Sequence, residues 1–546
     1  MTLTVVPKVA GAGLFDAAVS GGEAESGGEA ESGGEAETGG EAETADAASG
    51  TPPTIVERVI EKSGLTFELN GHLRGDLFVG KTVARSGVEV KSGYGELGLK
   101  VAVAKPGFGY VFSDVRFQGG YLNDARYFGQ PKGALPEYAD TGGVHAKAVL
   151  REAYAAVDVG PRLDVKLGYQ IIKWGRADTV NPTDNLTPVD WRVHSPDRMD
   201  RRLGNWALLA ALDLSPVRIE GVWVPIYVAS ILPEIDRPGF VVMDPQRQPN
   251  LDLSNGTAAA RVELLMPRVE ISLSYLFGYA LQPGLIHVSD NFEKMAETMA
   301  DNNVREEEEN APLAVAAPVA HVAMAPFRHH VAGFDFRADL GAEVSLQGEL
   351  AFKYPADYRK QAAPYHDDLD FQVAVPNPEL AYVVGISKTI GDVRLVGQYV
   401  GKTVFDWEAL PKAYDTDITD PTGSLEDLVG EETVVTDDMR DTIDGWTFRA
   451  LSYSNRLLAQ QSEKVQHGVS ARVAWNTLND RLRLSVFSLV NISTSEWLLY
   501  PEAAFGITED MWLTVGGELY QGPDDSRFGY IDEILSSQYT ELRIDF

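Results

Sequence analysis

Residues 269–277 read VEISLSYLF, and this stretch shows the pattern on which the fold depends. From Val269 to Tyr275 every second side chain is large and apolar, and the side chains between them are small or polar. Successive side chains of a strand point to opposite faces, so a period of two predicts a strand with one apolar face. The same pattern recurs at 64–71 (GLTFELNG), 481–489 (RLRLSVFSL) and 540–546. We therefore expect an all-β protein.

The lengths of these segments and the order of their connections narrow the fold further. The segments are longer than the five or six residues of a typical soluble strand and match the roughly nine to eleven residues of a tilted membrane-spanning strand. Short turns such as 105–107, 160–162 and 266–268 alternate with long connections such as 175–204 and 404–463. Outer-membrane barrels have short periplasmic turns and long extracellular loops, which requires this alternation. We predict a transmembrane antiparallel β-barrel of about 16–18 strands.

Eighteen strands are the preferred count, and an even number places both chain ends in the periplasm. The expected strands start near residues 64, 93, 109, 147, 163, 205, 216, 256, 269, 328, 342, 378, 392, 464, 481, 494, 511 and 537.

The composition excludes several classes of protein. The 546 residues carry 47 Lys+Arg against 80 Asp+Glu, a formal net charge of −33, which disfavours nucleic-acid binding. No cysteine is present, so disulfides, thiolate metal sites and a cysteine nucleophile are excluded. The sequence also lacks a GxSxG elbow, an HExxH helix and a Walker loop. We expect neither an enzyme nor a bound cofactor.

The N-terminal region differs in composition from the rest. Residues 21–44 are four hexapeptides, two GGEAES and two GGEAET, which have almost no apolar surface to bury. We expect residues 1–61 to be a disordered acidic arm and residues 62–546 to form the barrel. Residues 1–20 do not show the charged, apolar and small-residue regions of a signal peptide.

Charged residues are densest in one connection. Residues 168–202 read GYQIIKWGRADTVNPTDNLTPVDWRVHSPDRMDRR, in which the turn formers Asn181-Pro182 and Thr187-Pro188 favour an ordered loop. We predict that the loop 175–204 folds into the lumen, where closely packed Arg and Asp side chains select solutes by size and charge. The candidate residues are Trp174, Arg176, Asp178, Asn181, Asp184, Asp190, Arg192, Arg198, Arg201 and Arg202.

Two alternatives for this loop remain open. The same residues can form surface ion pairs that cap the barrel mouth without meeting a solute. The oxygens of Asp178, Asn181, Asp184 and Asn185 suit Ca²⁺, but their spacing does not fit the twelve-residue calcium loop. We expect no bound metal.

The WGRAD…NPTD pattern resembles that of uncharacterised porin-like outer-membrane barrel families, which carry a WGxxDxxNPxD motif after an early strand. The last strand, with Leu542, Ile544 and Phe546, resembles the terminal recognition strand of Gram-negative outer-membrane proteins. These resemblances imply a Gram-negative-type outer membrane, with lipid, lipopolysaccharide and the barrel-assembly machinery as partners.

Two functions follow from this reading. The first is a porin-like channel for passive diffusion of small hydrophilic solutes, narrowed by the charged loop. The alternative is a non-conducting barrel that acts as a scaffold, receptor or surface-binding protein. General porins are often trimers, but a large barrel with elaborate loops can function alone, so a monomer is slightly preferred.

Overall fold

The computed structural model describes residues 64–82, 85–122, 144–178, 180–232, 241–250, 252–291, 320–358, 375–409, 451–523 and 526–546. The acidic arm expected at 1–61 lies outside these ranges, so that expectation stays a prediction.

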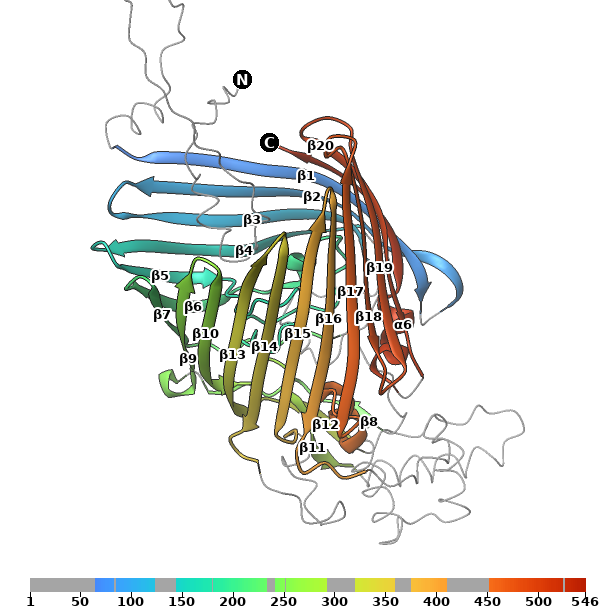
Figure 1. The fold of residues 1–546 in the computed structure, drawn as a ribbon. Coiled ribbons are helices and arrows are strands. Elements are labelled where there is room, and N and C mark those ends of the chain that lie inside the picture. Colours follow the sequence, from blue (N-terminus) through green and yellow to red (C-terminus); the bar gives the residue numbers. More distant parts are fainter. Residues whose placement is uncertain are drawn as a thin grey trace, which may run out of the picture.

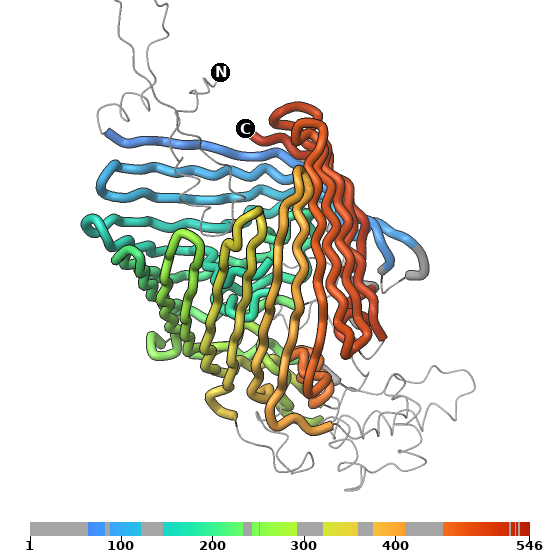
Figure 2. Tube along the Cα trace, in the orientation of Figure 1, coloured from blue at the N-terminus to red at the C-terminus, as the bar shows by residue number. Residues whose placement is uncertain are grey.

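Eighteen antiparallel strands form one closed sheet (Figures 1 and 2). Each strand pairs with the next along the chain, and β1 also pairs with β21, which closes the barrel. The strands are β1 (Thr66–Thr82), β2 (Arg85–Lys105), β3 (Gly109–Leu122), β4 (Val144–Val159), β5 (Leu163–Gln170), β6 (Asn205–Asp213), β7 (Val217–Val224), β9 (Thr257–Met266), β10 (Val269–Tyr279), β13 (Arg328–Gly341), β14 (Val344–Pro355), β15 (Glu379–Ile390), β16 (Val393–Val404), β17 (Val465–Thr477), β18 (Leu482–Asn491), β19 (Glu496–Gly506), β20 (Met511–Gln521) and β21 (Ser537–Asp545).

The predicted all-β barrel with eighteen strands is confirmed, and the strand starts agree closely except at β2. The sequence places that start near residue 93, whereas β2 begins at Arg85. The pairing of β1 with β2 shifts register after Phe78 and again after Lys81. These irregularities interrupt the period of two, so the sequence pattern does not show the ends of β1 and β2 that lie next to their connection.

The barrel has one end with tight turns. Eight hairpins, from β2–β3 to β19–β20, are closed there by two to four residues. Gly107, Gly160 and Gly391 adopt positive φ in three of these turns. Most connections at the opposite end are long, although 83–84 between β1 and β2 and 492–495 between β18 and β19 are short. The predicted alternation of short and long connections is present.

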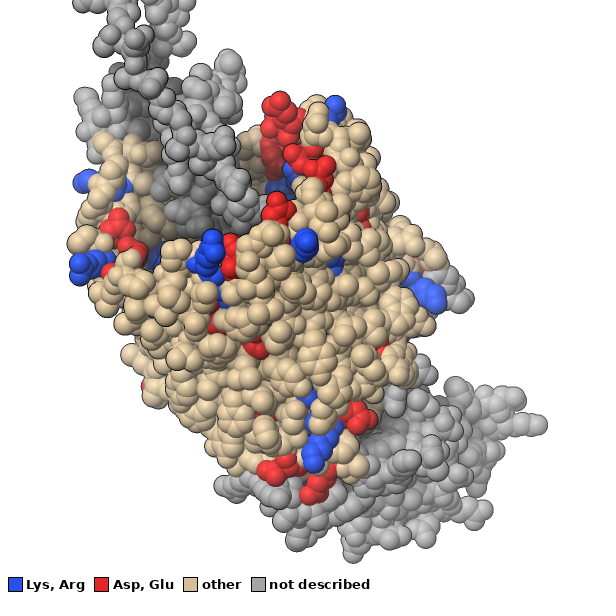
Figure 3. Space-filling model, viewed as in Figure 1, with Lys and Arg blue, Asp and Glu red and all other residues tan. Residues whose placement is uncertain are grey.

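The barrel wall has an apolar outer face and a charged inner face, which is the reverse of a soluble protein. Leu73, Leu273 and Leu350 point outward and are exposed, whereas Arg74, Asp335 and Glu349 point inward and are buried. In the view of Figure 3, charged side chains gather near the two ends of the wall and leave an uncharged band between them. A closed sheet with an apolar outer band satisfies its backbone groups without water, as a lipid bilayer requires. In the described part of the chain, no helix combines the length and apolarity needed to span a membrane.

Smaller elements occupy the end with long connections. Strands β8 (Val241–Met243), β11 (Gly284–Asp290) and β12 (Ala320–Ala325) form a separate sheet. An α-helical segment, residues 451–459, packs Leu451 against Leu285 and Met324 of this sheet. Two short 3-10 helices are η1 (Arg198–Arg201) and η2 (Leu253–Asn255).

The helix α6 (Arg527–Leu535) lies between β20 and β21. Its Leu535 and Phe528 pack against Phe487, Leu498 and Tyr520. These three side chains point inward from β18, β19 and β20, so α6 covers part of the inner wall.

The C-terminal strand carries the predicted assembly residues on its outward face. Leu542 and Phe546 are exposed, and Ile544 shares their face. The backbone of Phe546 exchanges two hydrogen bonds with Gly71, at 2.7 and 2.9 Å. The role of this strand as an assembly signal stays a prediction.

Candidate functional site

The connection between β5 and β6, here called the inner segment (residues 171–204), contacts inward-facing side chains around the barrel. It adopts little regular structure beyond η1, so side-chain contacts with the wall hold it in place. Its partners on the strands include Arg74, Tyr94, Arg116, Arg151, Glu152, Glu263, Glu270, Asp335, Glu349, Arg472, Phe487, Tyr500 and Glu518.

The first part of the inner segment is anchored by Trp174. Its ring is buried among inward-facing side chains of β6, β7, β9 and β10, including Val222 and Leu276. The guanidinium of Arg261 lies 5.4 Å from the ring centroid. Burial of an aromatic ring of this size is a large apolar contribution, so Trp174 fixes where the segment leaves the wall.

Glu349 of β14 holds the turn that follows. Its carboxylate accepts hydrogen bonds from the backbone N–H groups of Arg176 and Ala177, both at 2.6 Å. It also accepts from the Thr183 hydroxyl at 2.8 Å and the Thr183 N–H at 3.3 Å. A Cβ on Gly175 would lie 2.6 Å from this carboxylate, and Gly175 has a φ of +102°. Glycine is therefore required there by both space and conformation.

Arg176 reaches the acidic part of the same wall. Its guanidinium contacts Glu263 at 2.9 Å, Asp335 at 2.7 Å and also Glu270. Two residues later, Asp178 contacts Arg472 of β17 at 2.8 Å. These charge-assisted contacts spread the first half of the segment from β9 to β17.

Contacts within the segment stabilise its middle. Asp190 binds Arg192 through both carboxylate oxygens, at 2.7 and 2.8 Å. Asp184 forms an ion pair with Arg202. The side-chain amide of Asn181 faces the carbonyl oxygens of Ala177 and Val180, which its nitrogen can reach as a donor.

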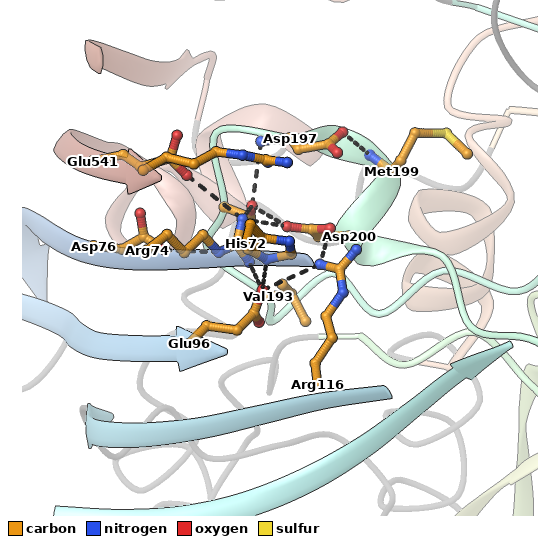
Figure 4. Close-up of polar contacts among 12 residues, drawn as sticks. His72, Arg74, Asp76, Glu96, Arg116, Val193, Asp197, Met199, Asp200 and Glu541 are labelled. Carbon is orange, nitrogen blue, oxygen red and sulfur yellow. Dashed lines mark hydrogen bonds and ion pairs between the residues drawn. The ribbon is translucent and has the colours of Figure 1, made fainter. Parts of the chain in front are cut away.

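The last part of the segment is organised around Asp200 (Figure 4). The Asp200 carboxylate contacts Arg74 of β1 at 2.7 Å and Arg116 of β3 at 2.5 Å. It also accepts a hydrogen bond from Ser195 at 2.5 Å. Arg151 of β4 donates to the carbonyl oxygens of Met199 at 2.6 Å and Arg202 at 3.1 Å.

Arg198 and Arg201 use different contacts. Arg201 forms an ion pair with Glu518 of β20 and donates to the carbonyl of Val193 at 3.0 Å. Arg198 lies over two aromatic rings, 3.9 Å from the centroid of Tyr500 and 4.8 Å from that of Phe487. Among the described residues no carboxylate contacts Arg198. Its charge is therefore oriented by cation–π contacts but not neutralised.

The barrel interior changes the proton affinity of several groups in the segment, among them His194 and Asp200. Burial lowers the pKa of His194 to about 4. Burial alone would raise the pKa of Asp200, but Arg74, Arg116 and Arg151 hold it below its ordinary value. At neutral pH the segment thus presents a neutral His194 and an ionised Asp200.

All ten residues predicted from the motif belong to this arrangement, but they divide into separate groups. The oxygens considered for calcium are engaged elsewhere, Asp178 with Arg472 and Asp184 with Arg202. The described residues contain no cluster of three potential metal ligands. Their use as a pore constriction stays a prediction.

The wall partners of the segment and the central role of Asp200 were not predicted from the motif. Arg74, Glu96, Arg116, Glu349 and Glu518 are strand residues, and each takes a place on a charged inner face. Charged residues at alternate strand positions, such as Arg74 and Asp76, indicate which side chains face the barrel interior. The sequence does not indicate which loop residue each of them contacts, because those contacts form only when the barrel closes.

No protein-family model matches the chain, and no curated protein sequence matches it. Several solved structures resemble the chain at low identity. OccAB1 of Acinetobacter baumannii has a TM-score of 0.44 at 8% identity, covering 88% of this chain and 96% of that one. OccAB3 of the same species has a TM-score of 0.44 at 12% identity, covering 88% and 98%. The outer membrane protein OpdK of Pseudomonas aeruginosa has a TM-score of 0.43 at 10% identity, covering 88% and 98%. Likeness at this level carries no argument about activity, so function is inferred from this chain's own residues.

Proposed function

We propose that this chain is an outer-membrane, porin-like channel through which small hydrophilic solutes diffuse passively, and that the inner segment forms its narrowest part. The observation that carries the proposal is the inverted polarity of the closed wall. Exposed Leu73, Leu273 and Leu350 suit lipid, while buried Arg74 and Glu349 suit a polar interior. Lipid and lipopolysaccharide outside, and the barrel-assembly machinery during insertion, are the partners that this proposal implies.

The inner segment supports the second half of the proposal. Its charges are fixed by wall contacts instead of moving freely, as in the Glu349 and Asp200 clusters. Preorganised charges of both signs create a local field that acts on a passing solute. Arg198 adds a cationic group with no carboxylate partner in the described part of the chain.

One observation favours the alternative, a non-conducting barrel that serves as a scaffold, receptor or surface-binding protein. The inner segment contacts wall residues from Arg74 of β1 to Glu518 of β20, and α6 covers the wall between β18 and β20. Two inward elements can fill a lumen as well as narrow it.

Conductance in planar bilayers separates the two functions. The purified, folded protein is expected to give discrete current steps. Replacing residues 178–197 with a short Gly-Ser linker should enlarge those steps, whereas Glu343→Gln in the tight β13–β14 turn should leave them unchanged. A folded wild-type barrel that inserts without conducting would support the alternative. Equal steps with and without the segment would reject it as the narrowest part.

A further inference from the structure

The wall beside Asp200 holds more carboxylates than its cations can neutralise. The guanidinium of Arg74 has four acidic neighbours, the carboxylates of Asp76 at 3.3 Å, Glu96 at 3.0 Å, Asp200 at 2.7 Å and Glu541 at 3.6 Å (Figure 4). All five side chains are buried. One guanidinium cannot satisfy four buried negative charges.

Neighbouring cations do not remove this excess. Arg116 contacts Glu96, Asp200 and a further acid, Asp114. Arg151 lies nearby and donates to backbone carbonyls. Five carboxylates (Asp76, Glu96, Asp114, Asp200 and Glu541) thus face three arginines (Arg74, Arg116 and Arg151), a net charge of −2 from 3 − 5. Arg543 of β21 does not change this balance, because it is paired with Asp545 at 2.8 Å. A protonated His72, which contacts Glu96 at 2.8 Å, would still leave a net charge of −1.

Three of the five carboxylates have partners suited to their ionised form. Glu96 is bound by His72, Arg74, Arg116 and Gln118. Asp200 is bound by Arg74, Arg116 and Ser195. Asp114 has Arg116 at 3.4 Å. The uncompensated charge therefore falls on Asp76 and Glu541.

Asp76 and Glu541 are placed to share a proton. They are direct cross-strand partners of β1 and β21 and both point inward. Directly opposed Cβ atoms lie about 4.5–5.5 Å apart, close enough for the carboxyl groups to meet, and like charges there repel. The hydroxyl of Tyr94, which lies opposite Asp76 on β2, donates its proton to the carbonyl of His194 at 3.0 Å. Within the described residues, Arg74 at 3.3 Å is then the donor group that remains for the buried oxygens of Asp76. A carboxylate oxygen donates only when it is protonated, so one proton would supply the missing donor.

We propose that Asp76 and Glu541 share one proton. Release of this proton makes the charge of the lumen wall depend on external pH, and it weakens the ion pair between Arg74 and Asp200. On release, a carboxylic acid and a carboxylate become two carboxylates, and the proton passes to solvent. The added charge draws Arg74 toward the pair and away from the inner segment. This inference deepens the proposed channel function, and its selectivity measurement rests on that function.

The groups around Asp76 and Glu541 explain why the proton is held by this pair and not by another acid. On β1 and β21 it faces Arg74, His72, Tyr539 and Arg543, and on β2 it faces Tyr94 and Glu96. Glu518 of β20 is held by Arg201, and Glu502 of β19 accepts from Tyr539 at 2.8 Å. From the inner segment, Asp200 is linked to the pair through Arg74. Every other acid in this group has a donor or a cation of its own.

Infrared spectroscopy tests the shared proton without requiring conduction. The folded wild-type protein should show one buried protonated-carboxyl band that is lost as the pH is raised. Asp76→Asn and Glu541→Gln should each lack that transition, while the matched control Glu502→Gln should keep it. The use of two variants guards against one that does not fold. No transition in the wild type, or a transition that survives in either pair variant, overturns the proposal.

Bilayer recordings test the coupling. In wild type and Glu502→Gln the cation-to-anion permeability ratio should rise about twofold over the same pH range, the effect of one added charge near the ion path. The ratio should stay flat in the two pair variants. A flat wild-type ratio overturns the coupling even if the infrared transition is present. A protein that shows the transition but never conducts rejects the proposed channel function and leaves the proton site standing.

Discussion

The two anchors of the inner segment use opposite chemistry. At its beginning, a wall carboxylate, Glu349, binds backbone N–H groups of the segment, and Trp174 is buried beside it. Near its end, a carboxylate of the segment, Asp200, binds the wall guanidiniums of Arg74 and Arg116. The first anchor depends on fixed hydrogen-bond geometry and burial. The second depends on a balance of charges, so it is the anchor that pH and mutation can adjust.

The largest expected effect is loss of the first anchor. Glu349→Ala leaves four hydrogen-bond contacts without an acceptor, which should destabilise the docked segment by about 3 kcal/mol or more. The rate of trypsin cleavage after Arg176 measures how often the segment is released. Glu349→Gln, which keeps an acceptor oxygen, should be cleaved more slowly than Glu349→Ala. Equal resistance of wild type and Glu349→Ala would show that Trp174 and the ion pairs of Arg176 hold this end without Glu349.

Asp200→Ala should have a smaller effect on the second anchor. Arg74 and Arg116 keep Glu96 as a partner after the change, so neither cation is stranded. We expect a loss of about 2 kcal/mol, less than for a buried ion pair whose remaining charge has no other partner. Trypsin cleavage after Arg198 and Arg201 reports on this end. A greater loss than with Glu349→Ala would reverse the ranking of the two anchors.

Acid should loosen the second anchor through His194. Because burial lowers the pKa of His194 to about 4, the docked segment favours the neutral imidazole. The contribution of neutral His194 to the stability of the docked segment is complete above the ordinary histidine pKa of about 6.5. That contribution is lost as the pH falls toward 4. The pKa of Asp200 is already below its ordinary value, so Asp200 stays ionised over this range. Cleavage should accelerate from pH 7 to pH 5 in wild type but not in His194→Gln, and an identical pH profile in both would contradict this role.

The smallest effect is expected at Arg198, which belongs to neither anchor. Arg198→Gln removes a positive charge that has no carboxylate partner among the described residues, so the permeability ratio should shift about twofold toward cations without faster cleavage. The matched variant Arg202→Gln removes the same charge but breaks the ion pair with Asp184. It should accelerate cleavage as well. Equal cleavage rates and permeability ratios in Arg198→Gln and Arg202→Gln would show that Arg198 and Arg202 do not differ in role.

The barrel itself could be predicted from the sequence because a period of two is a local property. Eighteen strand starts follow from it, and only the β1–β2 hairpin departs, where register shifts break the period. The charged loop was also visible, as were its ten candidate residues. Its partners were not, since Arg176 and Glu349 are 173 residues apart and meet only when the sheet closes. Helix α6 was missed because its nine residues lie within a longer connection without a clear pattern.

The central claim is that the inner segment lies in the conducting path. The chain has no cysteine, so Arg198→Cys introduces a single thiol whose modification can be followed in a bilayer recording. A charged methanethiosulfonate reagent added to open channels should reduce the current in discrete steps, and the wild type should not respond. A conducting Arg198→Cys channel whose thiol is modified without any change in current would contradict the account.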